Sequence, residues 1–162
     1  MKNLGSLLVA ASCLAVLTGW PAHAADFTAR VDTRQLRPAG PCDGGALRCG
    51  EAFVEGYGAA DWTFTVEAFE VVSATCIDYT ATTTFTLADD STLTLSETGS
   101  VCSPGKSLLA TPPFSWGNPA TASATWEVTG ATGQFAGLTG SGEDLLDEAG
   151  ALMRGAYTGE LG

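Results

Sequence analysis

Alternating apolar and polar residues predict two long neighbouring strands, Ile77–Leu87 and Thr92–Thr98, joined by a turn at Asp89-Asp90. In the first strand the odd positions are mostly apolar and the even positions are mostly threonine. This period of two is typical of a strand with one buried face. In the return strand, the odd positions are occupied by Leu93, Leu95 and Glu97. We therefore expect a β-hairpin with one face against the core.

The two apolar faces also fix the register of this hairpin, because a slip by one residue would turn one strand over. The register that fits the short turn pairs Phe85 with Leu93, and it sets Cys76 opposite Cys102. We predict a Cys76–Cys102 disulfide, which leaves Cys42 to pair with Cys49 across a glycine-rich turn. Each bridge is expected to stabilise the fold by about 2–4 kcal/mol.

Similar alternation predicts strands in most of the remaining chain, and no helical period is convincing after the first residues. Near Phe69 the apolar residues change sides, which indicates a bulge or burial on both faces. The expected strands cover residues 51–58, 61–72, 121–129, 134–146 and 151–161, and residues 26–31 form either a short first strand or an ordered tail. About eight antiparallel strands in so short a chain form either a sandwich or a barrel. We favour an all-β, closed and disulfide-braced barrel, because closure removes exposed edges and glycines in the last third ease the curvature.

The first 24 residues have the features of an export signal. Lys2 supplies the positive charge, Leu7–Leu17 the apolar run, and Ala22-His23-Ala24 the cleavage site. We divide the rest into a segment with a disulfide loop, residues 25–50, and a barrel domain, residues 51–162. The expected location is extracellular or periplasmic, with no membrane contact after signal cleavage.

Charge and histidine content narrow the function classes. The chain carries a formal net charge of −11, and such a surface repels nucleic acid and anionic membranes. The only histidine, His23, leaves with the signal, which argues against histidine-based triads and histidine-ligated metals. We expect neither a metal nor a cofactor. The acidic run Glu143-Asp144 with Asp147-Glu148 lacks a calcium-loop pattern, and we interpret it as a solvated turn.

The most distinctive string is Gly130-Ala131-Thr132-Gly133-Gln134-Phe135-Ala136-Gly137-Leu138-Thr139-Gly140. It resembles the Gly-x-Thr/Ser-Gly-x-Phe-x-Gly hairpin of the allene oxide cyclase and dirigent barrel families. The chain is also similar to secreted bacterial proteins with allene-oxide-cyclase-like barrels. The resemblance implies an eight-stranded antiparallel barrel and, as an activity, cyclisation or isomerisation. The motif forms a structural hairpin, so no catalytic residue of those families maps onto it.

The interior of a closed barrel is the default pocket. Weak catalytic candidates are Glu55, Glu67 and Tyr57, because a carboxyl facing the lumen would have a raised pKa. The alternative places both glutamates outside as solvated charges. Nine residues are candidates for lining a ligand site, with plain core packing as the alternative for each: Phe53, Tyr57, Trp62, Phe64, Tyr79, Phe85, Trp126, Met153 and Tyr157.

These observations lead to three hypotheses on function. The first is a secreted barrel that binds a small, largely apolar molecule in its lumen. The second is a cyclase or isomerase in which the barrel holds a reactive intermediate in one conformation. The third is a structural or interaction protein with a solid lumen, whose active surface would be the proline-rich segment with Phe114 and Trp116. The sequence identifies no oligomeric state.

Overall fold

The computed structural model describes residues 24–34, 42, 47–104, 108, 119–149 and 152–162. The predicted export signal, most of the disulfide loop and the proline-rich segment with Phe114 and Trp116 lie outside these residues. Among the described residues, no helix has both the length and the apolar character needed to cross a membrane.

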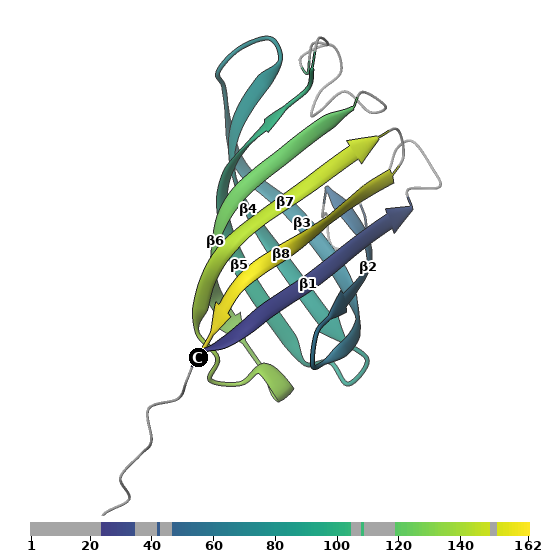
Figure 1. The fold of residues 1–162 in the computed structure, drawn as a ribbon, viewed down its shortest axis with the longest axis vertical. Coiled ribbons are helices and arrows are strands. Elements are labelled where there is room, and N and C mark those ends of the chain that lie inside the picture. Colours follow the sequence, from purple (N-terminus) through teal and green to yellow (C-terminus); the bar gives the residue numbers. More distant parts are fainter. Residues whose placement is uncertain (1–23, 35–41, 43–46, 105–107, 109–118, 150–151) are drawn as a thin grey trace, which may run out of the picture.

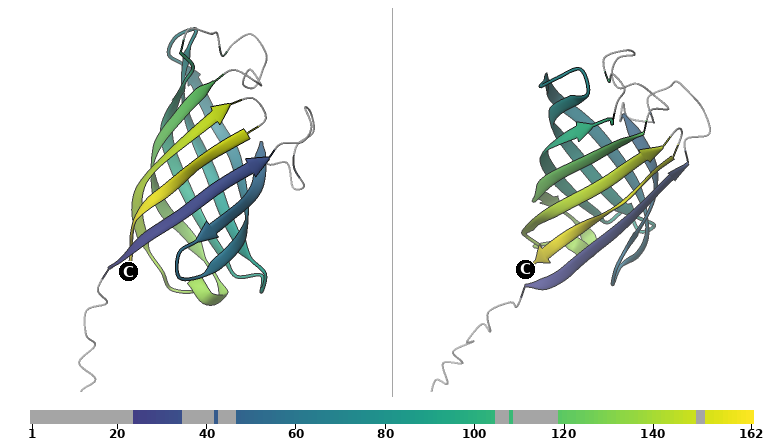
Figure 2. Two further views of the ribbon diagram at one scale, coloured as in Figure 1. Left: turned by 45° about the vertical axis from the view of Figure 1, so that its right-hand side comes forward. Right: turned by 45° about the horizontal axis from the view of Figure 1, so that its top comes forward.

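Eight antiparallel strands form a closed barrel in which every strand pairs with its neighbours in the sequence (Figures 1 and 2). β1 closes the barrel by pairing with both β2 and β8. The barrel therefore includes residues of the N-terminal segment that the sequence analysis placed before it. The strands are β1 (Ala25–Arg34), β2 (Arg48–Val54), β3 (Gly58–Val71), β4 (Cys76–Leu87), β5 (Thr92–Cys102), β6 (Ala120–Ala131), β7 (Gly140–Ala149) and β8 (Leu152–Leu161).

The predicted central hairpin is confirmed in strands, turn and register. β4 and β5 pair Phe85 with Leu93 and Cys76 with Cys102. Both predicted disulfides, Cys76–Cys102 and Cys42–Cys49, are formed. The predicted bulge is also present, because the β3–β4 register shifts between Val66 and Ala68. All-β architecture, barrel closure and disulfide bracing thus agree with the sequence.

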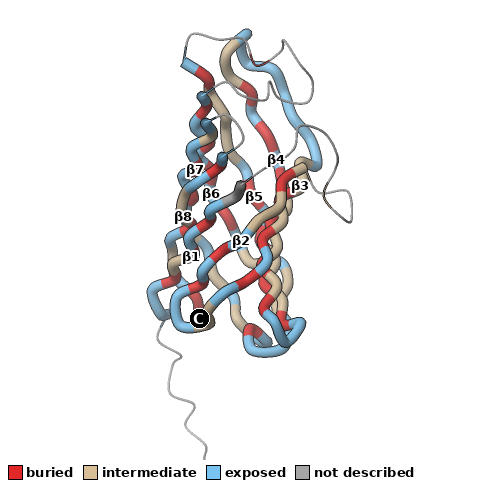
Figure 3. The backbone as a smooth tube through the Cα atoms, turned by 90° about the vertical axis from the view of Figure 1, so that its right-hand side faces the viewer, coloured by how far each residue is buried: buried red, intermediate tan, exposed pale blue. Residues whose placement is uncertain are grey.

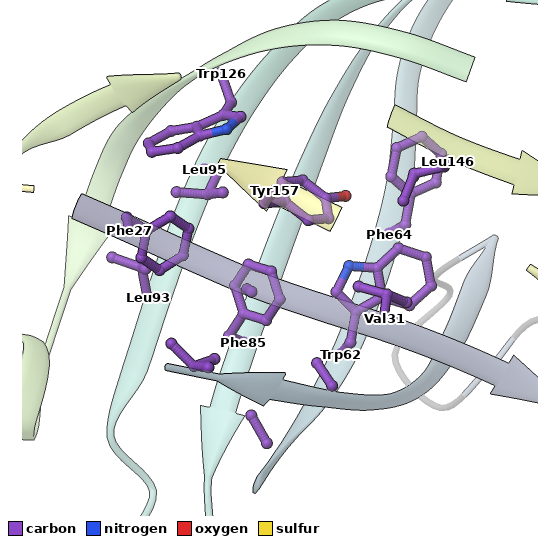
Figure 4. Close-up of a cluster of buried hydrophobic side chains, with 14 of the residues drawn as sticks. Phe27, Val31, Trp62, Phe64, Phe85, Leu93, Leu95, Trp126, Leu146 and Tyr157 are labelled. Atoms are coloured by element: carbon purple, nitrogen blue, oxygen red, sulfur yellow. The ribbon is translucent and has the colours of Figure 1, made fainter. Parts of the chain in front are cut away.

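Burial alternates along the strands, so each strand has an inner and an outer face (Figure 3). Aromatic rings from different strands meet edge to face inside the barrel (Figure 4). Phe27 and Trp126 have centroids 5.3 Å apart, and Phe85 and Tyr157 are also 5.3 Å apart. Such pairs contribute about 0.5–1.5 kcal/mol beyond their buried area. The aromatic rings therefore form a packed core rather than an open channel.

The barrel has two different ends. We call the end with the β2–β3, β4–β5 and β6–β7 connections the turn end, and the opposite end the loop end. The turn end is blocked by Phe135, which lies in the short helix η3 (Gly133–Phe135) and is fully buried. Tyr57 packs on it with centroids 4.5 Å apart, and the backbone N–H of Gln134 donates to Ser91 Oγ at 2.9 Å.

This plug corrects the prediction of a continuous strand over residues 134–146. β7 begins only at Gly140. Gly133 and Gly137 have φ values of 56° and 84°, a conformation that glycine adopts without a steric penalty. The glycines therefore form a turn that folds Phe135 back into the barrel, which a strand pattern does not reveal.

Trp126 depends on two inward-facing glycines. A Cβ atom on Gly142 would meet Thr158 O and lie 2.5 Å from Trp126 Cζ2, and one on Gly159 would lie 2.6 Å from the same ring atom. Gly142 and Gly159 are paired across β7 and β8. Together they leave the space that the indole of Trp126 occupies.

We predict that Gly142→Ala lowers the free energy of unfolding by about 1–3 kcal/mol, because the added methyl group overpacks the wall beneath Trp126. Gly130→Ala is the matched control, since its Cβ would lie at an ordinary 3.4 Å from Thr94 Cβ. Urea unfolding of both variants measures the difference. Equal stability of the two variants would contradict this account of the Trp126 contact.

Candidate lumen site

Two carboxyl side chains lie inside the barrel, halfway between its ends. Glu97 of β5 has 0% and Asp144 of β7 has 4% of its surface exposed. Their positions follow from alternation: Glu97 shares the inner face with Leu95, and Asp144 shares it with Leu146. We call Glu97 and Asp144 the carboxyl pair. Buried carboxyl groups are rare unless paired with cations, so this pair is the most unusual feature of the lumen.

Four further polar groups surround the carboxyl pair. The hydroxyls of Thr83 and Tyr157 lie 3.2 Å apart and share a hydrogen bond. Tyr79 OH and Trp62 Nε1 are buried and have no hydrogen-bond partner, and neither do the four oxygens of the carboxyl pair. An unsatisfied buried polar group costs about 1–3 kcal/mol. Their concentration in one place makes this cluster a candidate functional site.

Burial dominates the electrostatics of the pair. It raises the pKa of Asp144 to about 8, and the neighbouring Glu97 raises that pKa further. Burial also raises the pKa of Glu97, although the nearby Thr83 and Tyr157 hydroxyls counteract this. These hydroxyls act by proximity, because no carboxyl oxygen has an aligned hydrogen bond. Asp144 is therefore protonated at neutral pH and titrates just above it.

Burial and the carboxyl pair also shift the pKa values of Tyr79 and Tyr157. Burial is the main reason that the pKa values of Tyr79 and Tyr157 are raised, and the charges of the carboxyl pair add to the effect. Both phenols thus stay neutral and can donate a hydrogen bond across the physiological range. If a carboxyl of the pair ionises, the neutral hydroxyls of Tyr79 and Tyr157 are hydrogen-bond donors in the same cluster.

A cavity of about 40 Å³ lies between the cluster and the loop end. Tyr79 lines it and also interacts with both members of the carboxyl pair. Its wall is mainly apolar and includes Phe64, Val66, Val101, Leu108, Ala122, Leu146 and Met153. Ala122 of β6 and Leu146 of β7 line the cavity and are paired with each other. Two residues further from the loop end in the same strands, Ala124 and Asp144 are paired in the layer of the carboxyl pair. The cavity therefore lies one layer, about 7 Å, above that pair.

An ion pair lies at the loop end of this cavity. Arg48 Nη2 and Glu148 Oε2 are 3.3 Å apart, with side-chain exposures of 3% and 12%. Burial lowers the pKa of Arg48, while Glu148 opposes that shift. Burial likewise raises the pKa of Glu148, and Arg48 opposes it. The two residues are 100 positions apart in the sequence, so only barrel closure brings them together.

The structure places most of the predicted lining residues inside. Trp62, Phe64, Tyr79, Phe85, Trp126, Met153 and Tyr157 are all buried in the barrel. Phe53 is wrongly expected there: it is 56% exposed, because Ala52 and Val54 form the inner face of β2. Tyr57 is not in the cavity either, since it packs on Phe135 at the turn end.

The weak catalytic candidates Glu55 and Glu67 are exposed and lie away from the lumen. Sequence reasoning missed the carboxyls that do face inward. For Glu97 the signal was present, because it continues the apolar face of Leu93 and Leu95. The acidic run was misread as a solvated turn: it belongs to β7, which turns Asp144 and Glu148 inward and leaves Glu143 and Asp147 outside.

Within the ranges that the structure describes, no group of three or more metal-ligating side chains is gathered. The chain matches no family model, no curated protein and no solved structure. The geometry of the lumen is therefore the basis for any statement on function.

We predict that the free energy of unfolding falls as the pH rises from about 5 to 8. In this window the folded protein keeps a proton on Asp144, whose pKa is about 8, whereas the unfolded chain has lost it. One such proton changes stability by at most about 1.4 kcal/mol per pH unit. Glu97 and Glu148, whose pKa values are also raised, act in the same direction.

Urea unfolding at several pH values measures this slope. Asp144→Asn removes the titrating group and should flatten the slope, while the exposed neighbour substitution Glu143→Gln should leave it unchanged. Stability that rises between pH 5 and 8 in the unaltered protein would show that the carboxyl pair is ionised and paired, contrary to this account.

Proposed function

We propose that this protein binds a small, largely apolar molecule in the loop end of its barrel. The observation that carries the proposal is the apolar cavity with the unsatisfied polar cluster one layer beneath it. An apolar wall with a few convergent polar groups is the usual composition of a ligand site. The two disulfides are typical of proteins that work in oxidising surroundings, which supports an exported binding protein.

The size of the cavity limits the ligand. About 40 Å³ accommodates on the order of two or three water molecules. A ligand therefore has a slim end that enters the cavity, or it displaces the side chains at the loop end. Met153 lines the cavity, and methionine adapts its shape more easily than branched residues do.

Acid–base catalysis by the same cluster is the second candidate, because the pKa of Asp144 is about 8. General acids and bases work best with a pKa near the working pH. Tyr79, which lines the cavity, would be the neutral hydrogen-bond donor beside it. This candidate corresponds to a cyclase or isomerase, the activity that resemblance to allene oxide cyclase and dirigent barrels implies.

We predict saturable binding of 1-butanol, with a dissociation constant on the order of 1 mM, since so small a ligand offers few contacts. NMR titration of the Leu146 and Met153 methyl groups measures it. Ala122→Phe fills the cavity and should abolish the shifts. Ser123→Phe is the matched control, because residue 123 faces outward in the same strand. Binding that survives in Ala122→Phe would contradict the proposed location.

For the catalytic candidate, we predict that above pH 8, where Asp144 is mostly ionised, solvent deuterium exchanges into the α-carbon of added 3-pentanone faster than in buffer. Asp144→Asn should slow it about 100-fold or more, the usual contribution of a general base, while Glu143→Gln should not. Proton NMR of the ketone measures the rate. Equal exchange rates with and without the protein would contradict the catalytic candidate and leave only the binding function.

A further inference from the structure

Strand β3 is longer than its neighbour β2 at the loop end of the barrel. β3 spans Gly58–Val71, but its pairing with β2 ends at Phe64. On its other side, β3 stays paired with β4 as far as Val71, and their hairpin extends above the ends of β6, β7 and β8 (Figure 1). Within the described ranges, no strand pairs with residues 65–71 on the side of β2. We call this side of residues 65–71 the open edge.

The Cys42–Cys49 disulfide explains why β2 does not continue beside the open edge. The Cα atoms of the two cysteines are 6.0 Å apart, although the residues are 7 positions apart in the sequence. An extended strand of that length would span about 23 Å, at about 3.3 Å per residue. The chain before Cys49 therefore turns back instead of following β3, and the disulfide keeps the edge open.

Backbone groups at both ends of the open edge point away from β4. The Val72 N–H donates to the Cys76 carbonyl, and bonded and non-bonded residue pairs alternate along an antiparallel ladder. The N–H and C=O of Val71 therefore point to the open side. The Phe64 carbonyl accepts a hydrogen bond from the residue just before β2, so Val66, two residues further on, points the same way. Backbone groups in this arrangement are a template for a further strand.

The open edge is exposed on both faces of the strand. Burial alternates along β3 only as far as Phe64, and residues 67–71 are all exposed (Figure 3). Phe69, Val71 and the following Val72 are among the large apolar side chains that stay exposed. Phe69 and Val71 share one face of the strand because they are two positions apart. Exposed apolar side chains beside open backbone groups are typical of an interaction surface.

The polar side chains at the open edge are acidic. Glu67 and Glu70 are exposed, and Glu70 lies directly opposite Asp78 of β4, which is exposed as well. Like charges directly opposite each other destabilise a sheet. Neither ion pair of the described residues involves these three side chains. The edge is therefore complementary to a cationic partner, and the net charge of −11 attracts such a partner from a distance.

The same charges disfavour a second copy of this chain as the partner. Pairing two open edges would bring the glutamates of both copies together, at a cost in electrostatic repulsion. Charged side chains on an edge strand are a common protection against such pairing. A basic chain meets no such repulsion.

We propose that the open edge binds an extended cationic peptide segment, which adds to β3 as a further strand. Lysine or arginine side chains of the peptide lie beside Glu67, Glu70 and Asp78, and its apolar side chains lie beside Phe69 and Val71. Main-chain hydrogen bonds to β3 supply the affinity, and the alternating side chains supply the specificity. This surface is separate from the carboxyl pair, so the inference does not depend on the ligand proposed for the lumen.

NMR titration with two capped hexapeptides tests the inference: Lys-Val-Lys-Val-Lys-Val and Glu-Val-Glu-Val-Glu-Val. At low salt we expect the basic peptide to bind saturably and about tenfold or more tightly than the acidic one, and added salt should reduce this preference. Hydrogen exchange at the amides of Val66 and Val71 should slow when the basic peptide is bound, because both N–H groups then have partners. Exchange at Val71 that stays unchanged at saturation would overturn the proposed strand addition.

Two methylated forms of the basic peptide test the main-chain hydrogen bonds. One form carries methyl groups on its three lysine backbone nitrogens, and the other carries them on its three valine backbone nitrogens. Alternate residues of a strand point their N–H groups to opposite sides. One form should therefore bind like the unmodified peptide, and the other about tenfold or more weakly. Equal affinity of the two forms contradicts binding as a strand.

Variants assign the peptide to the open edge. Replacing both Glu67→Gln and Glu70→Gln should lower the affinity for the basic peptide about threefold to tenfold, because each exposed ion pair contributes little. The matched control replaces Glu127→Gln and Glu143→Gln on the outer faces of β6 and β7, which changes the net charge equally and should leave the affinity unchanged. An equal loss in both double variants would assign binding to net charge alone and overturn the inference.

Two further measurements separate this inference from other occupants and from the lumen site. Ala122→Phe fills the lumen cavity and should leave peptide binding unchanged, so a failed lumen proposal leaves the peptide test intact. Sedimentation of the protein without peptide should show a monomer. A dimer that protects the amides of Val66 and Val71 would assign the open edge to a second copy and overturn the inference, as would the absence of saturable binding by the basic peptide.

Discussion

Pairing of β1 with β8 is the constraint on which the structure depends. It turns one face of an eight-stranded sheet into an interior, with ten residue pairs from Ala25–Leu161 to Arg34–Leu152. Once the sheet is closed, an inward side chain has no solvent within reach except at the ends of the barrel. Apolar and aromatic residues gain from this, whereas carboxyl groups lose their hydration. The raised pKa values of Glu97 and Asp144 are a direct consequence.

Closure also divides the interior into two unequal halves. Toward the turn end, large rings such as Trp126 and Phe85 fill the lumen, and Phe135 blocks its exit. Toward the loop end, the inner face of β5 and β6 is lined by small residues, Gly99, Ala122 and Ala124. The cavity forms in this second half, and Cys76–Cys102 joins two strands at the same end. The cavity thus lies on the side of the Cys76–Cys102 disulfide, and the Phe135 plug lies on the opposite side.

Features set by contacts between residues close in the sequence could be predicted, whereas features set by the closed barrel as a whole could not. The register of Phe85 with Leu93 could be predicted, because two neighbouring strands and a short turn define it locally. Phe53 could not be placed from hydrophobicity alone. Its strand has a large mixed face and a small apolar one, and the crowded lumen takes the small face with Ala52 and Val54.

The site required information that no local pattern contains. Glu97 lies on a face that the alternation correctly marks as buried, but a charged residue at its end is easily taken for the edge of the core. Asp144 was hidden by the glycine turn, which shifts the start of β7. The Arg48–Glu148 ion pair joins strands that are remote in sequence. These features become visible only when the closed barrel sets the strands side by side.

The most direct test of the account is a ¹³C NMR titration of the side-chain carboxyl carbons of Glu97 and Asp144 in the unliganded protein. The account predicts that Asp144 titrates with a midpoint near 8 and that the resonance of Glu97 responds in the same range, because the two groups share one buried site. If both carbons instead titrated near 4, the usual value for solvated carboxyls, the lumen would not hold a buried carboxyl pair.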